Sequence, residues 1–288
     1  MMIEPHEITF WQRITRGRGG VFLCLPLILF TTVFLFYPLS RILVLSFLDP
    51  HFTLKHFAAL FQSPVYVKVL LLTLEISFLT TVLCLLLGYP VAYVVCTVRG
   101  RWATWLMGIV VLCFWTSILV RTYSWMILLQ RTGVINTVLL ELGIISKPLG
   151  LMYNLFGVCV GMVHVLLPYM VMPLYGVMEG IDRNLLKAGQ NLGATPFKAF
   201  WKVYVPLSLP GIGAGCILVF VIALGFFITP ALLGGGKVIM ISNLIDSQVT
   251  QLLNWGFASA LSLALILVTF SIFILSNRYL GLSKMWGG

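Results

Sequence analysis

The 288-residue chain is 60% hydrophobic and only 9% charged, with a mean hydropathy of +1.05. Soluble domains carry about 25% charged residues, so this composition excludes an ordinary soluble protein and indicates an integral membrane protein. The net charge is +10, but the basic residues lie in short segments between apolar windows. This distribution is typical of a membrane topology signal, and we therefore expect no nucleic-acid partner.

The first 18 residues are polar, and we expect them to form a cytosolic segment ahead of an uncleaved first span. Six windows free of acidic and basic residues follow, at 19–40, 76–98, 102–120, 148–178, 203–236 and 247–277. Each can supply the roughly 20 apolar residues with which a helix crosses about 30 Å of hydrocarbon. The second span is expected to begin near Val69. The sequence thus predicts an all-α integral membrane protein, a six-transmembrane-helix bundle in one domain, 1–288.

The basic residues set the predicted orientation. With the N-terminus inside, eleven of the eighteen Lys and Arg residues fall in inner segments and seven in outer ones. The positive-inside rule therefore favours cytosolic N- and C-termini. An even number of spans also places residues 181–210 in the cytosol. The outer connections are then 49–68, 130–150 and about 234–250, and the middle one is predicted to contain a short helix.

The segment 181–210 is a polar, basic interruption between two long apolar windows. Its first half, 184–192, has helix-forming composition, and Gly193 stands where a helix would end. Thr195 and Pro196 then predict the N-cap and the first residue of a second helix. The apolar face of the first helix consists of Leu185, Ala188 and Leu192. Its counterpart in the second consists of Phe197, Phe200, Trp201 and Tyr204.

This segment resembles the cytoplasmic coupling loop of binding-protein-dependent ABC importer permeases. The family pattern is Glu-Ala-Ala, a glycine four residues after the second alanine, nine further residues, and Ile-x-Leu-Pro. Here Lys187, Ala188 and Gly189 occupy the triplet, Gly193 the glycine, and residues 203–206 the ending. The spacing is kept, whereas Lys187 replaces the family glutamate and Gly189 the second alanine.

Three flanking stretches, 87–93, 114–125 and 166–175, look like the spermidine/putrescine permease branch of that family. The resemblance implies the type I importer fold, a bacterial inner-membrane location and a polyamine or related small amine as cargo. It also implies a homologous second permease subunit, two ATPase subunits with ATP and Mg, an extracytoplasmic substrate-binding protein, and membrane lipid around the bundle. Within a coupling loop of about 179–206, it assigns ATPase coupling to Leu185, Leu186, Lys187, Ala188, Gly189, Leu192, Gly193 and Ala194.

Catalytic motifs are not found in the sequence. The glycines before Lys237 lack the first glycine and the hydroxyl of a phosphate-binding loop, so we expect ATP hydrolysis in a separate subunit. No hydrolase or metalloprotease motif occurs either. The six cysteines all lie in apolar windows without a C-x-x-C pair, and we interpret them as buried packing residues rather than metal ligands.

Ionisable residues inside spans are the candidates for a translocation pathway, because a charge at the bilayer centre costs about 2.5–3.5 kcal/mol. Glu75 and Arg121 are expected at comparable depth. Glu75 could receive a cationic amine, or it could form a structural ion pair with Arg121, and the sequence leaves both open. Tyr123 and Trp125 either line the pathway through cation–π contacts or anchor the interface. His164 is expected to be neutral and hydrogen-bonded inside the bundle.

Two other classes of protein remain as alternatives. An ion-coupled secondary transporter of small amines or amino acids would need several inward-facing acids and inverted repeats, but the sequence offers one candidate acid and no convincing repeat. A membrane-embedded enzyme would need catalytic residues gathered at one depth, and only Glu75, Arg121 and His164 are available, on different spans.

Overall fold

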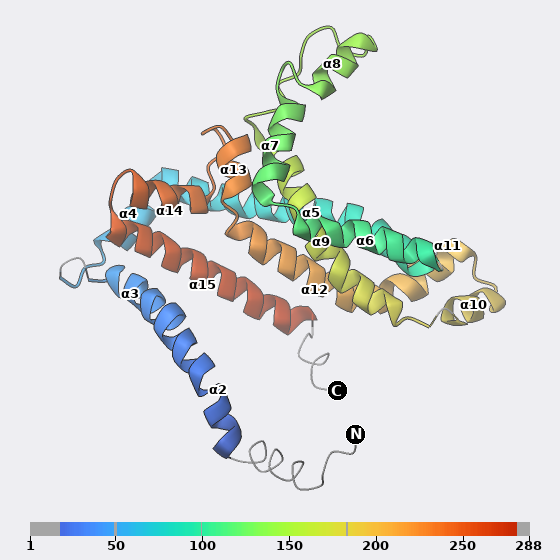
Figure 1. Cartoon of the computed structure of the whole chain (residues 1–288), viewed down its shortest axis with the longest axis horizontal. Coiled ribbons are helices and arrows are strands. Elements are labelled where there is room, and N and C mark those ends of the chain that lie inside the picture. Colours follow the sequence, from blue (N-terminus) through green and yellow to red (C-terminus); the bar gives the residue numbers. More distant parts are fainter. Residues whose placement is uncertain (1–17, 49–50, 99, 183, 281–288) are drawn as a thin grey trace, which may run out of the picture.

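The computed structural model describes residues 18–48, 51–98, 100–182 and 184–280. Every regular element in these ranges is a helix, which confirms the predicted all-α class (Figure 1). Five helices are long and apolar enough to cross a membrane, and a broken helix pair makes a sixth candidate. The predicted set of six apolar windows therefore corresponds to five continuous helices and one interrupted span.

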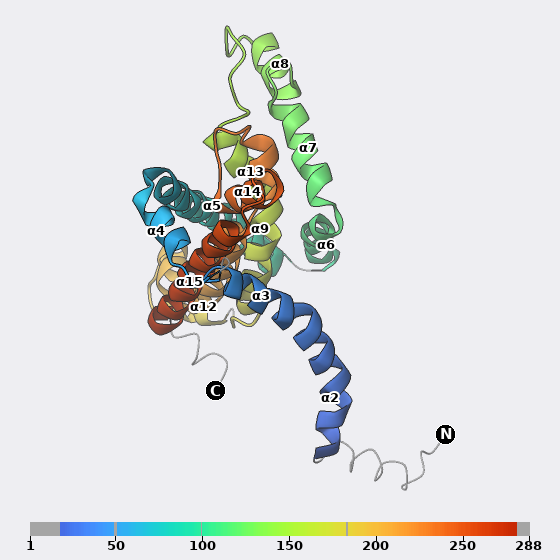
Figure 2. The ribbon, with the colours of Figure 1, turned by 90° about the vertical axis from the view of Figure 1, so that its left-hand side faces the viewer.

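The N-terminal helices form an apolar rod that stands away from the bundle. Helix α2 (Arg18–Thr31) continues through the π-helical η1 (Thr32–Phe36) into α3 (Tyr37–Leu45). None of the most apolar window of Cys24–Leu45 is buried inside the chain. Figures 1 and 2 show α2 projecting from the other helices, while α3 approaches α15. The rod thus presents an uncovered apolar surface to lipid or to another subunit.

Three helices form the core of the bundle: α5 (Pro64–Thr97), α9 (Leu155–Glu179) and α12 (Val205–Leu224). Glycines allow α12 to lie close to α9. A Cβ added at Gly215 would lie 2.7 Å from the sulfur of Met170, and one at Gly211 would lie 3.2 Å from the carbonyl oxygen of Pro173. Gly211 and Gly215, which lie four residues apart on α12, therefore serve helix packing within this chain. Buried side chains at the centre include Ile76, Met162, Leu166, Met170 and Leu174.

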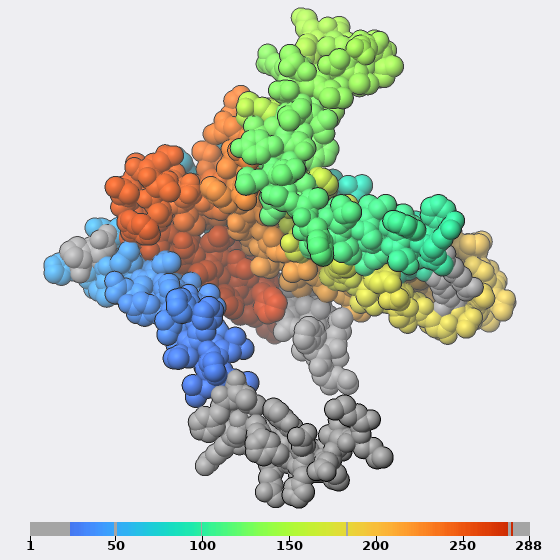
Figure 3. Space-filling model, in the orientation of Figure 1, coloured from blue at the N-terminus to red at the C-terminus, as the bar shows by residue number. Residues whose placement is uncertain are grey.

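The third predicted span is broken. Helix α6 (Arg101–Trp115) ends at Thr116 and α7 (Ile118–Leu129) begins after Ser117, because both intervening residues are extended, with ψ of 134° and 136°. The axis of Arg101–Trp115 is bent by 97° from that of Ile118–Glu141, a segment that includes α8 (Val134–Glu141). The bend turns α7 against α9 and α13 (Ile228–Leu233), and it carries α8 away from the bundle (Figures 1, 2 and 3). The expected continuous span over 102–120 is therefore wrong.

Short helices close one end of the bundle. Helix α13 packs on α7 and α9, while α4 (Lys55–Gln62) and α14 (Ile241–Thr250) contact α15 (Trp255–Leu280). A second cluster of buried residues forms beneath them, at Leu60, Ile241, Phe257 and Leu261. The second long helix starts at Pro64 rather than near Val69, because proline suits the first turn of a helix. The opposite end of the bundle carries α10 and α11 (Figure 1).

Candidate functional site

The helix–turn–helix at one end of the bundle is the first candidate site. It consists of α10 (Asn184–Asn191), a turn at Gly193, and α11 (Pro196–Ala199), and we call residues 184–199 the elbow. The turn is a Schellman motif: the Gly193 N–H donates to Gln190 O at 2.9 Å, and the Ala194 N–H donates to Gly189 O at 3.1 Å. Gly193 has φ +86°, a conformation that favours glycine. The predicted helix end is confirmed.

The second arm of the elbow is continuous with a membrane span. The Thr195 side chain caps α11 by accepting from the Lys198 N–H at 3.3 Å, and Pro196 follows in the first turn, as predicted. Helix α11 runs through the π-helical η2 (Phe200–Tyr204) into α12, so Pro196–Leu224 forms one 29-residue apolar helix. A displacement of the elbow is therefore transmitted directly to the packed core.

The elbow turns part of its apolar surface outward. Leu192 is 90% exposed and Phe197 is 74% exposed. Leu186 instead packs against the core cluster, and Phe200 contacts Tyr93 edge-on at 5.3 Å between ring centroids. The predicted stripe of the second helix is therefore divided, because Phe200 and Tyr204 face the bundle whereas Phe197 and Trp201 do not. The exposed apolar residues of the elbow and its extension are Leu185, Leu192, Phe197 and Trp201.

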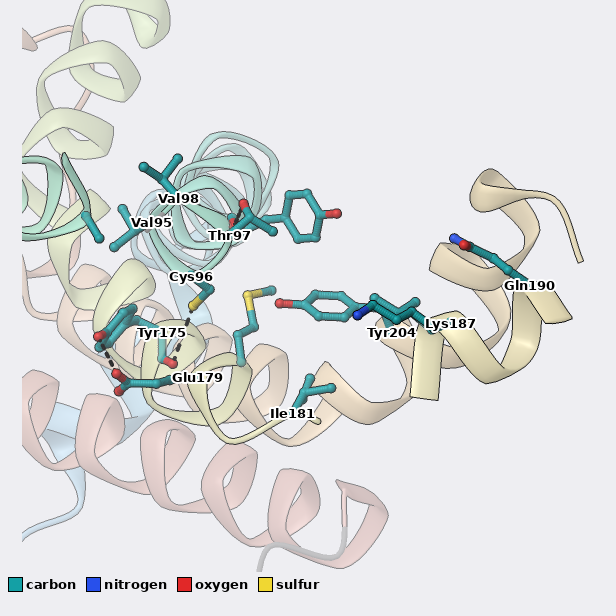
Figure 4. Close-up of a pocket in the computed structure, with 14 residues that line it drawn as sticks. Val95, Cys96, Thr97, Val98, Tyr175, Glu179, Ile181, Lys187, Gln190 and Tyr204 are labelled. Atoms are coloured by element: carbon teal, nitrogen blue, oxygen red, sulfur yellow. Dashed lines mark hydrogen bonds between the residues drawn. The ribbon is translucent and has the colours of Figure 1, made fainter. Parts of the chain in front are cut away.

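A cavity of about 500 Å³ separates α10 from the ends of α5 and α9 (Figure 4). Lys187 extends from α10 toward Tyr204, into this cavity. Glu179 lies on the other side, where one carboxylate oxygen accepts from the Tyr175 hydroxyl at 2.7 Å. Lys187, which replaces the family glutamate, therefore borders this cavity while remaining exposed, and Leu192 is exposed at the end of α10.

The two ionisable pathway candidates, Glu75 and Arg121, form no ion pair among the described residues. Glu75 lies on the exposed side of α5, and no salt bridge between described residues links it to Arg121. The Arg121 Nη2 donates instead to the carbonyl of Thr116 at 3.2 Å, next to the break between α6 and α7. Its Nε and Nη1 are buried without a partner among the described residues. The structure therefore shows no Glu75–Arg121 ion pair among its described residues, and the Arg121 guanidinium bonds to the backbone at the break instead.

Of the two aromatic candidates, Trp125 forms a side-chain hydrogen bond, whereas Tyr123 is exposed. The Trp125 Nε1 donates to His164 Nδ1 at 3.0 Å, and both side chains are half-buried. Tyr123 is 51% exposed on the outside of α7. The hydrogen bond confirms that His164 is bonded inside the chain. It also gives Trp125 a structural role that the sequence did not predict, because the two residues lie 39 positions apart.

Sequence reasoning missed a polar seam along α5. Thr73 accepts from the Ile241 N–H at 2.9 Å, which ties α5 to α14. Ser77 is fully buried, and its hydroxyl has no partner among the described residues. The helical spacing of the small residues is the signal that could have revealed this seam. Its members are Thr73, Ser77, Thr80, Thr81, Cys84 and Gly88.

Metal-ligand chemistry finds little support in the described ranges. No group of three or more His, Cys, Asp or Glu residues there could hold a metal ion. All six cysteines are free thiols, and Cys84 and Cys159 are buried in helix packing. The described residues therefore provide two features: the elbow, which is continuous with a membrane span, and half-buried polar groups between α7 and α9.

Comparisons with known proteins assign this architecture. The family described as "Binding-protein-dependent transport system inner membrane component" matches residues 84–281. The chain is 40% identical over 223 residues to the spermidine/putrescine transport system permease protein PotB of Haemophilus influenzae, covering 77% of this chain and 78% of that protein. The corresponding protein of Escherichia coli K12 is 39% identical over the same length, and the alignment covers 81% of it.

A solved structure supports the fold independently. A bacterial alginate ABC transporter, crystallised in complex with an alginate pentasaccharide-bound periplasmic protein, contains a chain that superposes with a TM-score of 0.74 at 21% identity. The superposition covers 93% of this chain and 96% of that chain, and it bears on fold alone. The architecture is that of a type I ABC importer permease, as predicted. The chain belongs to the inner membrane components of binding-protein-dependent transport systems, which are permeases rather than enzymes.

Proposed function

We propose that this permease subunit imports a polyamine or a related small amine across a bacterial inner membrane. The observation that carries this proposal is the 40% identity over 77% of the chain to a spermidine/putrescine permease. The chain contributes the transmembrane pathway. A homologous second permease subunit, two ATPase subunits that bind ATP and Mg, and an extracytoplasmic binding protein complete the importer.

The elbow is the contact for the ATPase in this proposal. Its end of the bundle, together with both chain termini, faces the cytosol, in agreement with the distribution of basic residues. The exposed Leu185 and Leu192 offer apolar anchors for a cleft of the ATPase, as an amphipathic helix does in a groove. Leu186 holds α10 to the bundle and Gly193 sets the angle between its arms. Closure of the ATPase dimer then moves α12 and alternates access.

Lys187 has a different place in this proposal from the acid that it replaces. Its side chain borders the cavity beneath α10 while remaining exposed, so we place it beside that cavity rather than among the apolar anchors of the elbow. Ala188, Gly189 and Ala194 serve the geometry of the helix and its end. Gly189 faces α11 and η2, and an added Cβ there would meet Ala199 and Val203 only at an ordinary contact distance of 3.8 Å.

The amine pathway is proposed to run past the exposed side of α5 and the inner side of α7. Glu75 has no ion-pair partner among the described residues, so its carboxylate is available to a cation. Trp125 offers an aromatic ring on the inner side of α7, whereas Tyr123 lies on the outside of that helix and is placed at the edge of the pathway. Arg121, whose Nε and Nη1 are buried without a partner among the described residues, repels the cargo and so keeps it on the side of Glu75.

Transport by the purified complex tests the proposed function. The permease, co-purified with its partners, is placed in proteoliposomes with ATP inside and labelled putrescine or spermidine outside with the binding protein. We expect amine uptake that requires both ATP and the binding protein. An amino acid and an alginate oligosaccharide serve as control cargoes. Uptake driven by an ion gradient without ATP would instead indicate the secondary-transporter alternative.

A further inference from the structure

A second cavity, of about 560 Å³, lies at the end of the bundle opposite the elbow. Segments far apart in the sequence converge on it: α4, the first turn of α5, the end of α14 and the start of α15 (Figure 1). The neighbouring buried cluster contains Phe257, which also lines the cavity, so its floor is packed. Its polar lining residues are Lys55, His56, Tyr66, Gln248 and Asn254.

The electrostatics of this cavity favour an anion. Three helices begin beside it, α4 at Lys55, α5 at Pro64 and α15 at Trp255, and helix N-termini carry partial positive charge. Lys55 also lines the cavity, and none of the described residues that line it is acidic. A cationic cargo is therefore disfavoured here, whereas a carboxylate is stabilised.

Gln248 shows independently that the cavity is built for a polar ligand. Its side chain is only 5% exposed, it lines the cavity, and its amide forms no hydrogen bond with another described residue. Neither atom of its amide group is among the solvent-inaccessible, unpaired side-chain atoms of the described residues, so the amide is open to the cavity. Asn254 differs, because its Oδ1 accepts from the Phe257 N–H at 3.2 Å and caps α15. The Gln248 amide is thus the group available to bond an incoming acceptor.

The rim of the cavity indicates a protein rather than a free ion. Leu252, on the rim, is 65% exposed, and its neighbour Leu253 is 71% exposed. Leu253 also has φ +52°, a left-handed conformation that costs about 1–2 kcal/mol for such a residue. Backbone strain of this kind is found at binding sites. Exposed leucines beside a polar cavity offer apolar contact area that an inorganic anion cannot use.

We propose that this cavity is a socket for an acidic side chain of the extracytoplasmic binding protein. The carboxylate enters between Lys55 and Gln248, while Leu252 and Leu253 pack against an apolar patch around it. The proposal rests on the proposed function, which supplies the binding protein and places this end of the bundle outside. It adds the residues that receive the binding protein and the chemistry of the group received.

ATP hydrolysis by the reconstituted complex, titrated with amine-loaded binding protein, tests the socket. Lys55→Glu should raise the binding-protein concentration for half-maximal stimulation by about tenfold or more, because the charge is reversed at a desolvated contact. Gln248→Leu removes the amide without adding charge, and it should raise the same half-maximal concentration by about threefold. Lys68→Glu is the matched control, since Lys68 is an exposed lysine of α5 that does not line the cavity. This control should shift the titration by less than about twofold.

A reciprocal charge reversal identifies the partner group. With the Lys55→Glu complex, one acid-to-lysine variant of the binding protein should restore the wild-type titration. The socket proposal is overturned if Lys55→Glu and Lys68→Glu behave alike, if Gln248→Leu leaves the titration unchanged, or if no reversed acid restores it. A shift that appears only in vesicles containing anionic lipid, or that inorganic phosphate reproduces, also overturns it by assigning the cavity to a headgroup or free anion. Absence of stimulation in the wild-type complex would instead contradict the proposed function.

Discussion

The two ends of the bundle differ in what they leave exposed. The elbow end presents apolar side chains on a convex helix, with Leu192 90% exposed. The opposite end gathers short helices around a polar cavity lined by Gln248, whose amide forms no hydrogen bond with another described residue. A convex apolar helix suits a cleft in a rigid partner, and a polar cavity suits a single inserted side chain. The difference fits the two proposed roles, in which the elbow end receives the ATPase and the opposite end receives the binding protein.

The strongest way to break this comparison is to disrupt the elbow alone. Gly193→Val places a β-branched residue at φ +86°, where the strain is about 1–3 kcal/mol and shifts a two-state equilibrium by about fivefold or more. We expect a similar or larger fall in stimulated ATP hydrolysis and amine uptake, with membrane insertion unchanged. Gly189→Ala is the control, because a Cβ there meets only ordinary contacts at 3.8 Å. Normal coupling in Gly193→Val would contradict the assignment of the elbow.

Paired substitutions at the two ends sharpen the comparison. Leu192→Ser should weaken ATPase association by about tenfold, since a buried leucine contributes about 1.5–3 kcal/mol. Leu252→Ser should leave ATPase association unchanged and weaken the binding-protein titration instead. Co-purification of the ATPase and the titration of hydrolysis measure the two effects. An identical response of both variants would show that the ends are not specialised.

Between the two ends, Glu75 tests the proposed route of the amine. Glu75→Gln keeps the shape of the side chain but removes its charge, so we expect amine uptake to fall by about threefold to tenfold, as for a loss of about 0.7–1.4 kcal/mol. Glu141→Gln, at an exposed site on α8, is the matched control. Unchanged uptake together with a lower melting temperature would indicate a structural role for Glu75.

The smallest expected effect concerns the contact between α7 and α9. Trp125→Phe removes the donor to His164 Nδ1 and should lower the free energy of unfolding by about 0.5–1.5 kcal/mol. A thermal-shift measurement on the purified complex detects this change. Tyr123→Phe, on the exposed side of α7, should leave the melting temperature unchanged. A large loss of uptake in Trp125→Phe at unchanged stability would place the indole in the pathway.

Local features of the fold were predictable from the sequence. The end of α10 at Gly193 and the cap of α11 at Thr195 follow from backbone conformations and side-chain hydrogen bonds within a few residues. The apolar windows follow from hydrophobicity alone. These features depend little on the rest of the chain, so the sequence is sufficient to locate them.

Features that depend on tertiary geometry were not predictable. The break at Thr116 and Ser117 contains neither glycine nor proline, and the sequence carries no other kink signal there. Because of that bend, equal predicted depth did not bring Glu75 and Arg121 together. The Trp125–His164 hydrogen bond and the cavity at Gln248 join segments far apart in the chain. Such contacts require the helix orientations, which hydrophobic windows do not specify.

The uncovered rod Cys24–Leu45 has a consequence for the biogenesis of the protein. A newly inserted copy buries none of the most apolar window of this rod against its own later spans, although α3 contacts one of them, α15. Lipid alone must solvate it until another subunit arrives. Assembly is then under stoichiometric control, because a subunit made in excess keeps a recognisable apolar surface on which membrane proteases can act.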